Sequence, residues 1–416
     1  MRILKLTKNV ERSLLRSRRE RDDEAHRVAR RIVADVQERG DTALCEWTKK
    51  FDGVDLRAGI WISAREIEKA GNAVTKDLRH AIEHAARNIR GVAKKQLPRK
   101  WTFEVEPGVR ITQVVRPIDS VGCYIPGGRF SLMSTLLMTV VPALVAGVKR
   151  IVVASPKPNA ALLAAANILG VTSIARIGGA QAIAALAYGT KTIAPVDKIF
   201  GPGNRFVTTA KQLVSRDCAI DLPAGPTEAI VLANAGNAQW IAADLLAQAE
   251  HAPDAAVFLV TASRNLAVRT QVEIRRQLQL LPRTNPAHLS VLRNSAILLA
   301  RSMPSACEFV NRYAPEHLSL AQTSQTLINK VSAAGAVFLG SWSAQSLGDY
   351  ATGSNHVLPT AGWARARGGL SAADFVKCIT MQTIDSKGFK RLANDVAVLA
   401  RAEGLLAHVN ALEVRR

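Results

Sequence analysis

The sequence lacks the features that mark a disulfide-stabilised or membrane-spanning protein. Its five cysteines are odd in number, widely spaced and never arranged as C-x-x-C, so they indicate neither a disulfide framework nor a thiolate metal site. The best candidate for a long apolar run, residues 136–148, is too short to span a bilayer and contains Pro142. A secretory signal is also missing. We therefore expect a cytoplasmic protein in which nitrogen and oxygen atoms hold any metal.

Aromatic and acidic residues are scarce as well. Aromatics make up 5% of the chain, and the formal net charge is +21. A nucleic-acid-binding protein would concentrate its basic residues in a patch and interleave aromatics, whereas these basic residues are interspersed with acids. The densest part, residues 1–31, runs into helix-like sequence. We interpret residues 1–20 as a solvated N-terminal arm, and the surplus charge as an aid in attracting an anionic cofactor.

What the sequence contains is a helical first part and an alternating middle. The length of 416 residues allows several domains. Residues 22–40 have helical periodicity and end at Gly40, and residues 63–96 open with S-A-R-E, a capping-box pattern. Strand-like and helix-like segments then alternate from Val109 to Leu232, which is typical of a mostly parallel, doubly wound sheet. The predicted strands are residues 109–115, 121–125, 151–154, 174–177, 198–200 and 229–232.

Three of these strands are followed by glycine-rich turns. The turns are P-G-G-R-F-S after Ile125, G-G-A-Q after Ile177 and G-P-G-N after Phe200. Such turns place backbone N–H groups and helix starts where an α/β sheet binds its ligand, and together they favour a nucleotide site. Neither G-x-G-x-x-G nor G-x-x-x-x-G-K-[ST] occurs, so each turn taken singly is equally compatible with a structural role.

Residues 240–251, W-I-A-A-D-L-L-A-Q-A-E-H, predict an amphipathic helix that ends in a Gln and a His three residues apart. Residues at this spacing share a helix face. Gln248 and His251 could therefore present an amide oxygen and an imidazole nitrogen to one divalent metal ion. The alternative is a plain helix end whose histidine caps carbonyl groups or packs.

A set of motifs in chain order resembles the histidinol dehydrogenase family. The motifs are Y-I-P-G-G (124–128), G-G-A-Q-A-I-A-A-L (178–186), G-P-G-N (201–204), A-G-P-T-E (224–228), Q-A-E-H (248–251), Y-A-P-E-H-L (313–318), G-D-Y-A-T-G-S-N-H-V-L-P (348–359) and the segment 403–408. The resemblance implies a zinc-dependent enzyme that oxidises L-histidinol through L-histidinal to L-histidine with two NAD⁺, in the last steps of histidine biosynthesis. It also implies a homodimer whose C-terminal residues complete the partner's site.

The resemblance assigns roles to individual residues. Zinc ligands would be Gln248, His251, Asp349 and His408; the catalytic acid–base pair would be Glu316 and His317; and NAD contacts would be Tyr124, Gln181 and Asn204. The substrate would be bound by Thr227, His356 and Glu403, together with the zinc ligands and His317. The chain departs from the family at Thr227, where serine is commoner, and at Arg129 and Phe130, where small residues are usual.

The chemistry of these residues agrees with the implied roles. A histidine such as His317 suits removal of the hydroxyl proton, and Glu316 suits activation of water for the aldehyde step. Taken alone, P-E-H-L is also typical of an exposed helix start. Two other functions stay open: a related enzyme that oxidises another small primary alcohol, and a basic, non-catalytic binding scaffold.

For the fold, we expect two Rossmann-like, doubly wound α/β domains, one inserted in the other. Residues 123–227 would form the NAD-side domain. Residues 21–122 and 228–370, which include strands near 255–260 and 336–340, would form the domain with the zinc and catalytic residues. Residues 371–416 would form a C-terminal helical dimerisation tail.

Overall fold

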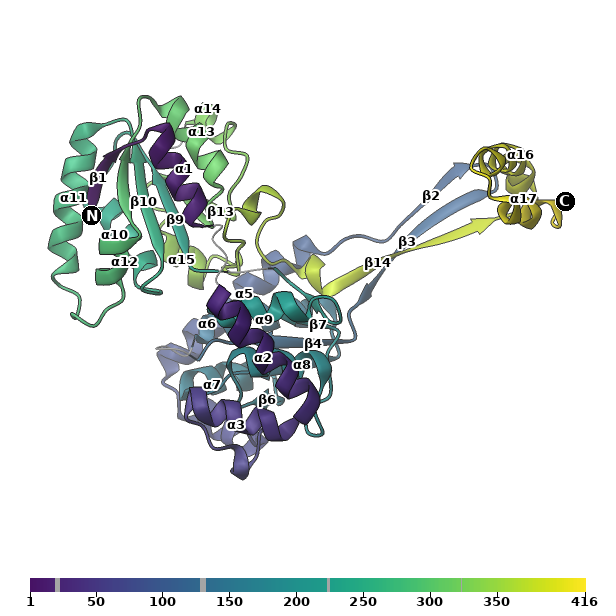
Figure 1. The fold of residues 1–416 in the computed structure, drawn as a ribbon, viewed down its shortest axis with the longest axis horizontal. Coiled ribbons are helices and arrows are strands. Elements are labelled where there is room, and N and C mark those ends of the chain that lie inside the picture. Colours follow the sequence, from purple (N-terminus) through teal and green to yellow (C-terminus); the bar gives the residue numbers. More distant parts are fainter. Residues whose placement is uncertain (19–22, 128–131, 223–224, 323) are drawn as a thin grey trace.

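The chain forms two α/β units, each built on a parallel sheet, and a projecting arm (Figure 1). This computed structural model describes residues 1–18, 23–127, 132–222, 225–322 and 324–416. Arg129 and Phe130 lie outside the described residues. Among the residues described, no helix combines the length and the apolar character that crossing a membrane requires. The apolar segment around Pro142 lies in helix α6 (Met133–Ala146), most of which is buried inside the protein.

The first unit is a six-stranded parallel sheet covered on both faces. Its strand order is β1 (Arg2–Lys5), β11 (Ala296–Leu299), β10 (Ala256–Thr261), β9 (Glu228–Leu232), β12 (His317–Leu320) and β13 (Ala336–Leu339). Alternate residues of the central strands point to opposite faces, as the two-residue repeat of a strand requires. Val231 packs under α10 (Ala238–Ala249), α11 (Arg264–Leu278) and α12 (Ala287–Arg293), and Leu232 packs under α1 (Lys8–Ser17) and α13 (Met303–Tyr313).

The second unit is a five-stranded parallel sheet, with the order β6 (Ile174–Ala175), β5 (Arg150–Ala154), β4 (Ser120–Tyr124), β7 (Lys198–Phe200) and β8 (Ala219–Ile220). Cys123 faces α6 and α7 (Ala160–Leu169), and Tyr124 faces the opposite layer of helices. That layer contains α2 (Asp23–Arg39), α3 (Asp41–Asp52), α8 (Gly179–Tyr188) and α9 (Arg205–Val214). In the five-stranded sheet, successive strands are added first on one side of β4 and then on the other. The six-stranded sheet has the same arrangement around β9, as in doubly wound folds.

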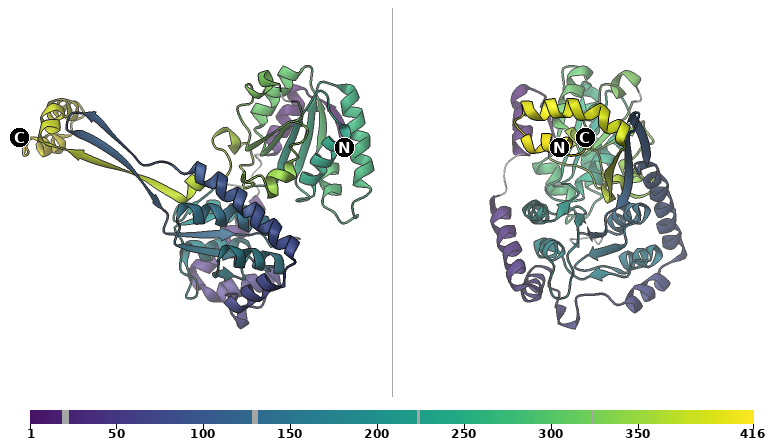
Figure 2. Two further views of the ribbon diagram at one scale, coloured as in Figure 1. Left: turned by 180° about the vertical axis from the view of Figure 1, so that it is seen from behind. Right: turned by 90° about the vertical axis from the view of Figure 1, so that its right-hand side faces the viewer.

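The arm is a three-stranded antiparallel sheet in the order β14 (Val376–Ile384), β3 (Val109–Pro117) and β2 (Trp101–Glu106). It extends from the five-stranded unit and carries α16 (Ser386–Ala402) and α17 (Leu406–Glu413) at its tip (Figure 2). The predicted C-terminal tail therefore contains a 3₁₀ helix and a nine-residue strand first, and its α-helices begin only at Ser386.

The N-terminal region differs from the predictions in two respects. Residues 1–17 are not a solvated arm, because β1 pairs with β11 and Leu4 and Val10 pack against the core of the six-stranded unit. Helices α2 to α5 pack against the five-stranded unit, mainly on α6 to α9, and this packing differs from the predicted grouping of residues 21–122 with residues 228–370. Chain order agrees with the packing of α5 (Lys76–Gln96) on this unit, because the chain runs from α5 through two arm strands into β4.

The predicted helix over residues 63–96 is two helices. Ser63 and Glu66 form the predicted capping box at the start of α4 (Ala64–Ala73). Val74 is extended, and the side chain of Thr75 then accepts a hydrogen bond from the N–H of Leu78 at the start of α5. Thr75 thus starts a second helix directly after the first one ends. Hydrophobic periodicity alone does not reveal this break. Three short 3₁₀ helices complete the elements, at Leu56–Ala58, Trp363–Arg365 and Ala372–Phe375, together with α14 (Gln325–Ile328) and α15 (Gln345–Tyr350).

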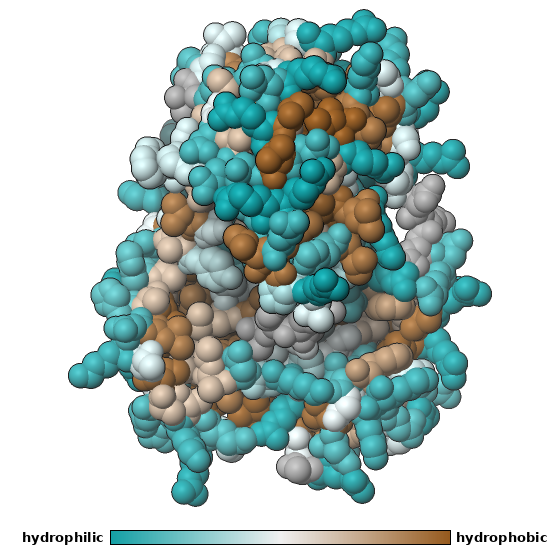
Figure 3. Space-filling model, turned by 90° about the vertical axis from the view of Figure 1, so that its left-hand side faces the viewer, coloured by the Kyte–Doolittle hydropathy of each residue, from teal (hydrophilic) through white to brown (hydrophobic). Residues whose placement is uncertain are grey.

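The predicted strands are present, but one belongs to another sheet than expected. β3 is part of the antiparallel arm, whereas β9 is central in the six-stranded sheet, within the predicted domain 228–370. The face of the molecule on the left of Figure 1 is largely hydrophilic, with apolar patches between the polar side chains (Figure 3). Exposed apolar residues of α11 and α12 include Val272 and Leu292.

Candidate active site

A cavity of about 270 Å³ lies where the carboxyl ends of the five-stranded sheet meet the amino ends of the six-stranded sheet. The loops after β4 and β7 supply one wall. The segments that precede β9, β10 and β12 supply the other. The predicted site residues that line it are Asn204, Thr227, Gln248, His251, Glu316, His317, Asp349 and His356. The fold thus gathers eight residues that are spread over 153 positions of sequence, from Asn204 to His356.

Glu316 and His317 enter the cavity at the amino end of β12, between β9 and β13. Both residues are buried, with 8% and 3% of their surface exposed. The Glu316 Oε2 atom accepts a hydrogen bond of 2.9 Å from the backbone N–H of Glu228 and lies 3.6 Å from His317 Nδ1. The alternative interpretation of P-E-H-L as an exposed helix start is wrong, because this segment begins a buried strand.

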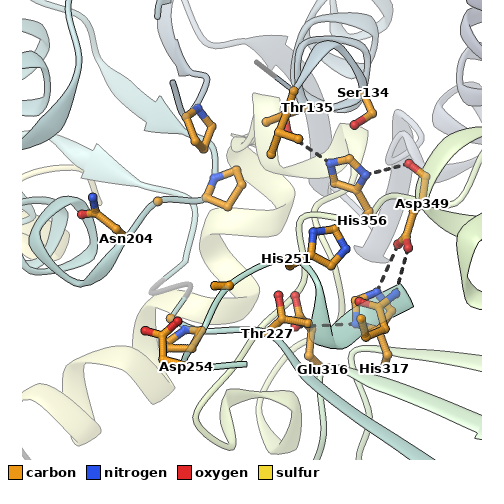
Figure 4. Close-up of a pocket in the computed structure, with 18 of the residues that line it drawn as sticks. Ser134, Thr135, Asn204, Thr227, His251, Asp254, Glu316, His317, Asp349 and His356 are labelled. Carbon is orange, nitrogen blue, oxygen red and sulfur yellow. Dashed lines mark hydrogen bonds and ion pairs between the residues drawn. The ribbon is translucent and has the colours of Figure 1, made fainter. Parts of the chain in front are cut away.

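Asp349, in the short helix α15, connects the site residues. Its carboxylate accepts a 2.9 Å hydrogen bond from Gln248 Nε2, and its other oxygen lies 3.2 Å from His317 Nε2. Its carbonyl oxygen lies 2.7 Å from His356 Nδ1, and His356 Nε2 lies 3.3 Å from the hydroxyl of Thr135 (Figure 4). One aspartate therefore orients an amide and two imidazoles around the same cavity.

Gln248 and His251 occupy different parts of their segment. Helix α10 ends at Ala249, so Gln248 lies in its last turn and His251 lies two residues beyond it. The helix therefore begins and ends two residues earlier than the predicted span 240–251, and both side chains line the cavity. Gln248 is fully buried, and its Oε1 atom has no hydrogen-bond partner among the described residues. A buried carbonyl oxygen without a partner is costly, which fits an atom kept for a ligand.

Electrostatics at the cavity centre follow from burial and close carboxylates. Burial disfavours the charged form of His317, but Glu316 and the hydrogen bond to Asp349 outweigh it and raise its pKa to about 10. Burial acts to raise the pKa of Asp349, yet contact with His317 holds it below its usual value. For His356, burial is the largest effect and lowers the pKa. Asp349 and His317 thus form a charged pair, beside a neutral His356.

A second cavity of about 450 Å³ adjoins the first, and Pro126 and Asn204 line both. All three residues predicted to contact NAD line it: Tyr124, Gln181 and Asn204. The Tyr124 hydroxyl accepts a 3.1 Å hydrogen bond from the N–H of Gly179, and burial raises the pKa of this phenol. Asn204 caps α9 through its side chain. The three predicted residues therefore line one cavity, which adjoins the cavity that contains Glu316 and His317.

The two cavities also contain residues that the sequence analysis did not identify. Thr135 and Asp254 line the first cavity, and Phe51, Asp52 and Lys157 line the second. Asp52 accepts a 3.1 Å hydrogen bond from Gln181 Nε2, and burial raises its pKa. These residues lie on α3, α6 and loops outside the recognised motifs, so their sequence context carried no signal.

Glu403 and His408 lie elsewhere, at the tip of the arm. Glu403 is the C-cap of α16, and His408 is in α17. Both are exposed, and neither is among the described residues that line the two cavities. Within one chain, the structure therefore brings together ten of the predicted site residues and separates these two from them.

The residues present fit a metal ion only as part of a larger set. Among the described residues, no group of three or more His, Cys, Asp or Glu side chains is arranged to hold a metal. Of the predicted ligands, the cavity contains the imidazole of His251, the carboxylate of Asp349 and the amide oxygen of Gln248, which has no partner among the described residues. These are nitrogen and oxygen donors that suit a borderline cation such as Zn²⁺, with one further ligand needed for four-coordination.

Comparison with known proteins decides the family. The family model described as histidinol dehydrogenase matches residues 15–416. The chain belongs to the histidinol dehydrogenase family. The histidinol dehydrogenase of Mannheimia succiniciproducens is 45% identical over 390 residues, which are 92% of this chain and 91% of that protein. A Photorhabdus laumondii protein named as a bifunctional histidine biosynthesis protein is 47% identical over 398 residues, and the chain spans 49% of its length.

A solved structure of the same family has the same fold. The crystal structure of histidinol dehydrogenase from Elizabethkingia anophelis is similar over 100% of this chain and 98% of that chain, with a TM-score of 0.93 and 39% identity. The similarity to the histidinol dehydrogenase family stated from the sequence motifs is thereby confirmed. The parallel, mixed α/β fold is confirmed at the same time.

Proposed function

We propose that this chain is a histidinol dehydrogenase that oxidises L-histidinol through L-histidinal to L-histidine, with two NAD⁺ as hydride acceptors. The observation that carries this proposal is the adjoining pair of cavities. One contains three of the four predicted zinc ligands and the predicted catalytic residues, and the other contains the predicted NAD contacts. Asn204 lines both, so a dinucleotide held in the second cavity would lie beside the first. Membership of the family supports the same conclusion.

Substrate binding follows from the polar groups of the first cavity. Zinc held by Gln248, His251 and Asp349, with His408 of the partner subunit, would supply a Lewis-acidic template for the imidazole and amine of histidinol. His356 is fixed at both ring nitrogens by Asp349 and Thr135, and we assign it to substrate contact. Thr227 keeps the hydroxyl that serine provides elsewhere in the family and lines the same cavity.

The catalytic pair divides the proton transfers. In the first step His317 takes the hydroxyl proton while hydride leaves the carbinol carbon for NAD⁺. Glu316 then takes a proton from the water that adds to the aldehyde, and the resulting hydrate anion passes the second hydride to a second NAD⁺ as it becomes the carboxylic acid. Glu316 is suited to this role because its Oε2 atom is held by the N–H of Glu228.

His317 needs a lower pKa than its value of about 10 to act as a base near neutral pH. The raised pKa depends partly on the free carboxylate of Asp349. A cation coordinated by that carboxylate would offset its negative charge and so favour the neutral imidazole. Metal binding and base strength are therefore coupled through Asp349 in this proposal.

We further propose a homodimer in which the arm of each subunit completes the other subunit's site. The arm carries Glu403 and His408 away from the cavity of its own chain (Figure 1). It also exposes large apolar side chains along its length: Trp101, Phe103, Met381, Leu399 and Leu406. Exposed apolar surface of this kind favours a protein partner. The cytoplasmic location stays a prediction.

Subunit complementation tests the shared site. His251→Asn and His408→Asn homodimers should each be inactive. Mixing the unfolded variants and refolding them together should restore about a quarter of the wild-type activity, because half of the random dimers are hybrids with one intact site. Lack of any recovery, with both variants inactive, folded and dimeric, would place His408 in the chemistry of its own subunit; an active His408→Asn homodimer would place it outside the chemistry.

Substrate identity is tested by comparing kcat/KM for L-histidinol and for small primary alcohols without an imidazole, in the zinc-loaded full-length protein. We expect NADH formation with L-histidinol and a strong preference for it, because Asp349 and Thr135 orient His356 toward the cavity. Faster turnover of an alcohol without imidazole would assign the chain to a related enzyme of different specificity. Protein that binds zinc and NAD⁺ but oxidises none of these alcohols would refute the proposed activity.

A further inference from the structure

Helix α9 contains a lysine that is 1% exposed, Lys211, directly behind the Gly201–Asn204 loop. Its ammonium group forms an ion pair with Asp221 and donates to two backbone carbonyls, those of Gly201 at 2.8 Å and Leu222 at 3.2 Å. The three N–H bonds of the ammonium group thus have three acceptors. The side chain of Asp221 is fully buried as well.

Asp221 completes the contact with the same loop. Its Oδ2 atom accepts a 2.8 Å hydrogen bond from the N–H of Gly201, and its Oδ1 atom accepts one of 2.6 Å from the N–H of Leu222. Both backbone polar groups of Gly201 are therefore bound to one ion pair. The lysine holds the carbonyl, and the aspartate holds the N–H.

The loop needs such backbone contacts because it has few side chains of its own. Gly201 has φ +115°, and a Cβ atom there would lie 2.1 Å from the carbonyl oxygen of Tyr124, so only glycine fits this approach to β4. Pro202 has no N–H group to donate. Asn204 follows directly, begins α9 and lines both cavities. The position of Gly201 therefore determines where Asn204 stands.

A buried ion pair is a poor device for stability alone. Removing two charges from water costs several kcal/mol per ion, and apolar residues of similar volume are often equally or more stabilising. Here the two charges instead bind backbone groups of Gly201 and Leu222, and Gly201 begins the loop whose Asn204 lines both cavities. These backbone contacts distinguish the Lys211–Asp221 pair from residues that only fill the core.

We propose that Lys211 and Asp221 are positioning residues for the dinucleotide, which hold the Gly201–Asn204 loop in its NAD-binding conformation. This inference rests on the proposed function of the second cavity. Neither side chain touches the cavity, so both act through the backbone of Gly201. Loss of the pair should weaken NAD⁺ binding while the residues that perform the chemistry stay in place.

The test compares two variants with the wild type. Lys211→Met keeps the length of the side chain and removes the charge, but leaves Asp221 buried without its partner. Lys211→Met/Asp221→Asn removes both charges, and the amide oxygen of asparagine can still accept from Gly201. We measure thermal stability, the Kd of NAD⁺ by calorimetry, and kcat and KM with L-histidinol. Leu298→Ala, in the buried core of the six-stranded sheet, is the control for stability loss alone.

We expect the double variant to be more stable than Lys211→Met, because no uncompensated charge remains buried. Both variants should bind NAD⁺ about ten- to a hundredfold more weakly, with kcat changed much less, as for a binding group moved out of place. Leu298→Ala should lose stability and keep its NAD⁺ affinity. If Lys211→Met does not fold, the double variant alone decides.

A double variant with wild-type NAD⁺ affinity would overturn the inference and leave the pair a structural role. A drop in affinity equal to that of Leu298→Ala at matched stability would do the same. The proposed function fails separately, if the wild-type protein forms no NADH from L-histidinol.

Discussion

Replacement of Glu316 by Gln should separate the two oxidations. Glutamine keeps the shape of the side chain, and its amide oxygen can still accept from the N–H of Glu228. It loses the negative charge and the ability to take a proton from water. The aldehyde step, which requires an activated water, should therefore suffer far more than the alcohol step.

The magnitude follows from the contacts of Glu316. General acid–base catalysis contributes about 10²–10⁴-fold, and we expect a loss in this range for histidinal oxidation. The charge of Glu316 lies 3.6 Å from His317 Nδ1, which corresponds to at most about 4–5 kcal/mol at an effective dielectric constant of about 20. Removing it lowers the pKa of His317 from about 10 toward its ordinary value. Since this change favours the basic form of His317, the alcohol step should be largely preserved.

The assay is single-turnover NADH formation from L-histidinol and, separately, from L-histidinal. Glu308→Gln is the matched control, because Glu308 is an exposed residue of α13 outside both cavities. Equal and mild losses on both substrates would remove the water-activating role of Glu316. A loss confined to the alcohol step would reverse the assignment of the two catalytic residues.

Two further substitutions test the metal site and its support. His251→Asn should lower zinc occupancy and turnover together while the fold survives. The control His84→Asn, at an exposed residue, should change neither. Full zinc content and full turnover in His251→Asn would contradict the ligand assignment. Burial raises the pKa of Asp244 on α10 to about 6, although the N–H of Gln345 on α15 donates to it. Because the folded-state pKa lies above the unfolded value, this carboxylate lowers stability as the pH rises through about 6. Asp244→Asn should therefore raise the free energy of unfolding by about 1–2 kcal/mol at pH 7–8, after allowance for solvent screening, and by nothing below about pH 4; a gain that is independent of pH would refute this cause.

The site was predictable where residue type and motif agreed. Gln248 and Asp349 come from helices α10 and α15 and meet in one hydrogen bond of 2.9 Å, and their motifs identified both. Sequence spacing could not show this contact, because it depends on the packing of α10 against α15. The motif of His317 indicated that this residue belongs to the site, but not that it lies in a strand, since P-E-H-L has the composition of a helix start.

The sheets were less predictable than their strands. β1 and β9 are separated by more than half of the chain, yet both belong to the six-stranded sheet. Hydrophobic runs locate strands but do not specify their neighbours, so β3 was expected in the wrong sheet. The helices α2 to α5 were assigned to the wrong unit for the same reason. Their apolar faces predict burial, and the partner of each face is set by the tertiary fold.

The most direct test of the account is the stoichiometry of a complete reaction. Zinc-loaded, full-length protein is given a limiting amount of L-histidinol and excess NAD⁺, and NADH and L-histidine are quantified together. The account predicts two NADH and one L-histidine for each L-histidinol consumed, because His317, which serves the alcohol step, and Glu316, which serves the aldehyde step, line the same cavity. One NADH for each histidinol, with histidinal released as the product, would contradict it.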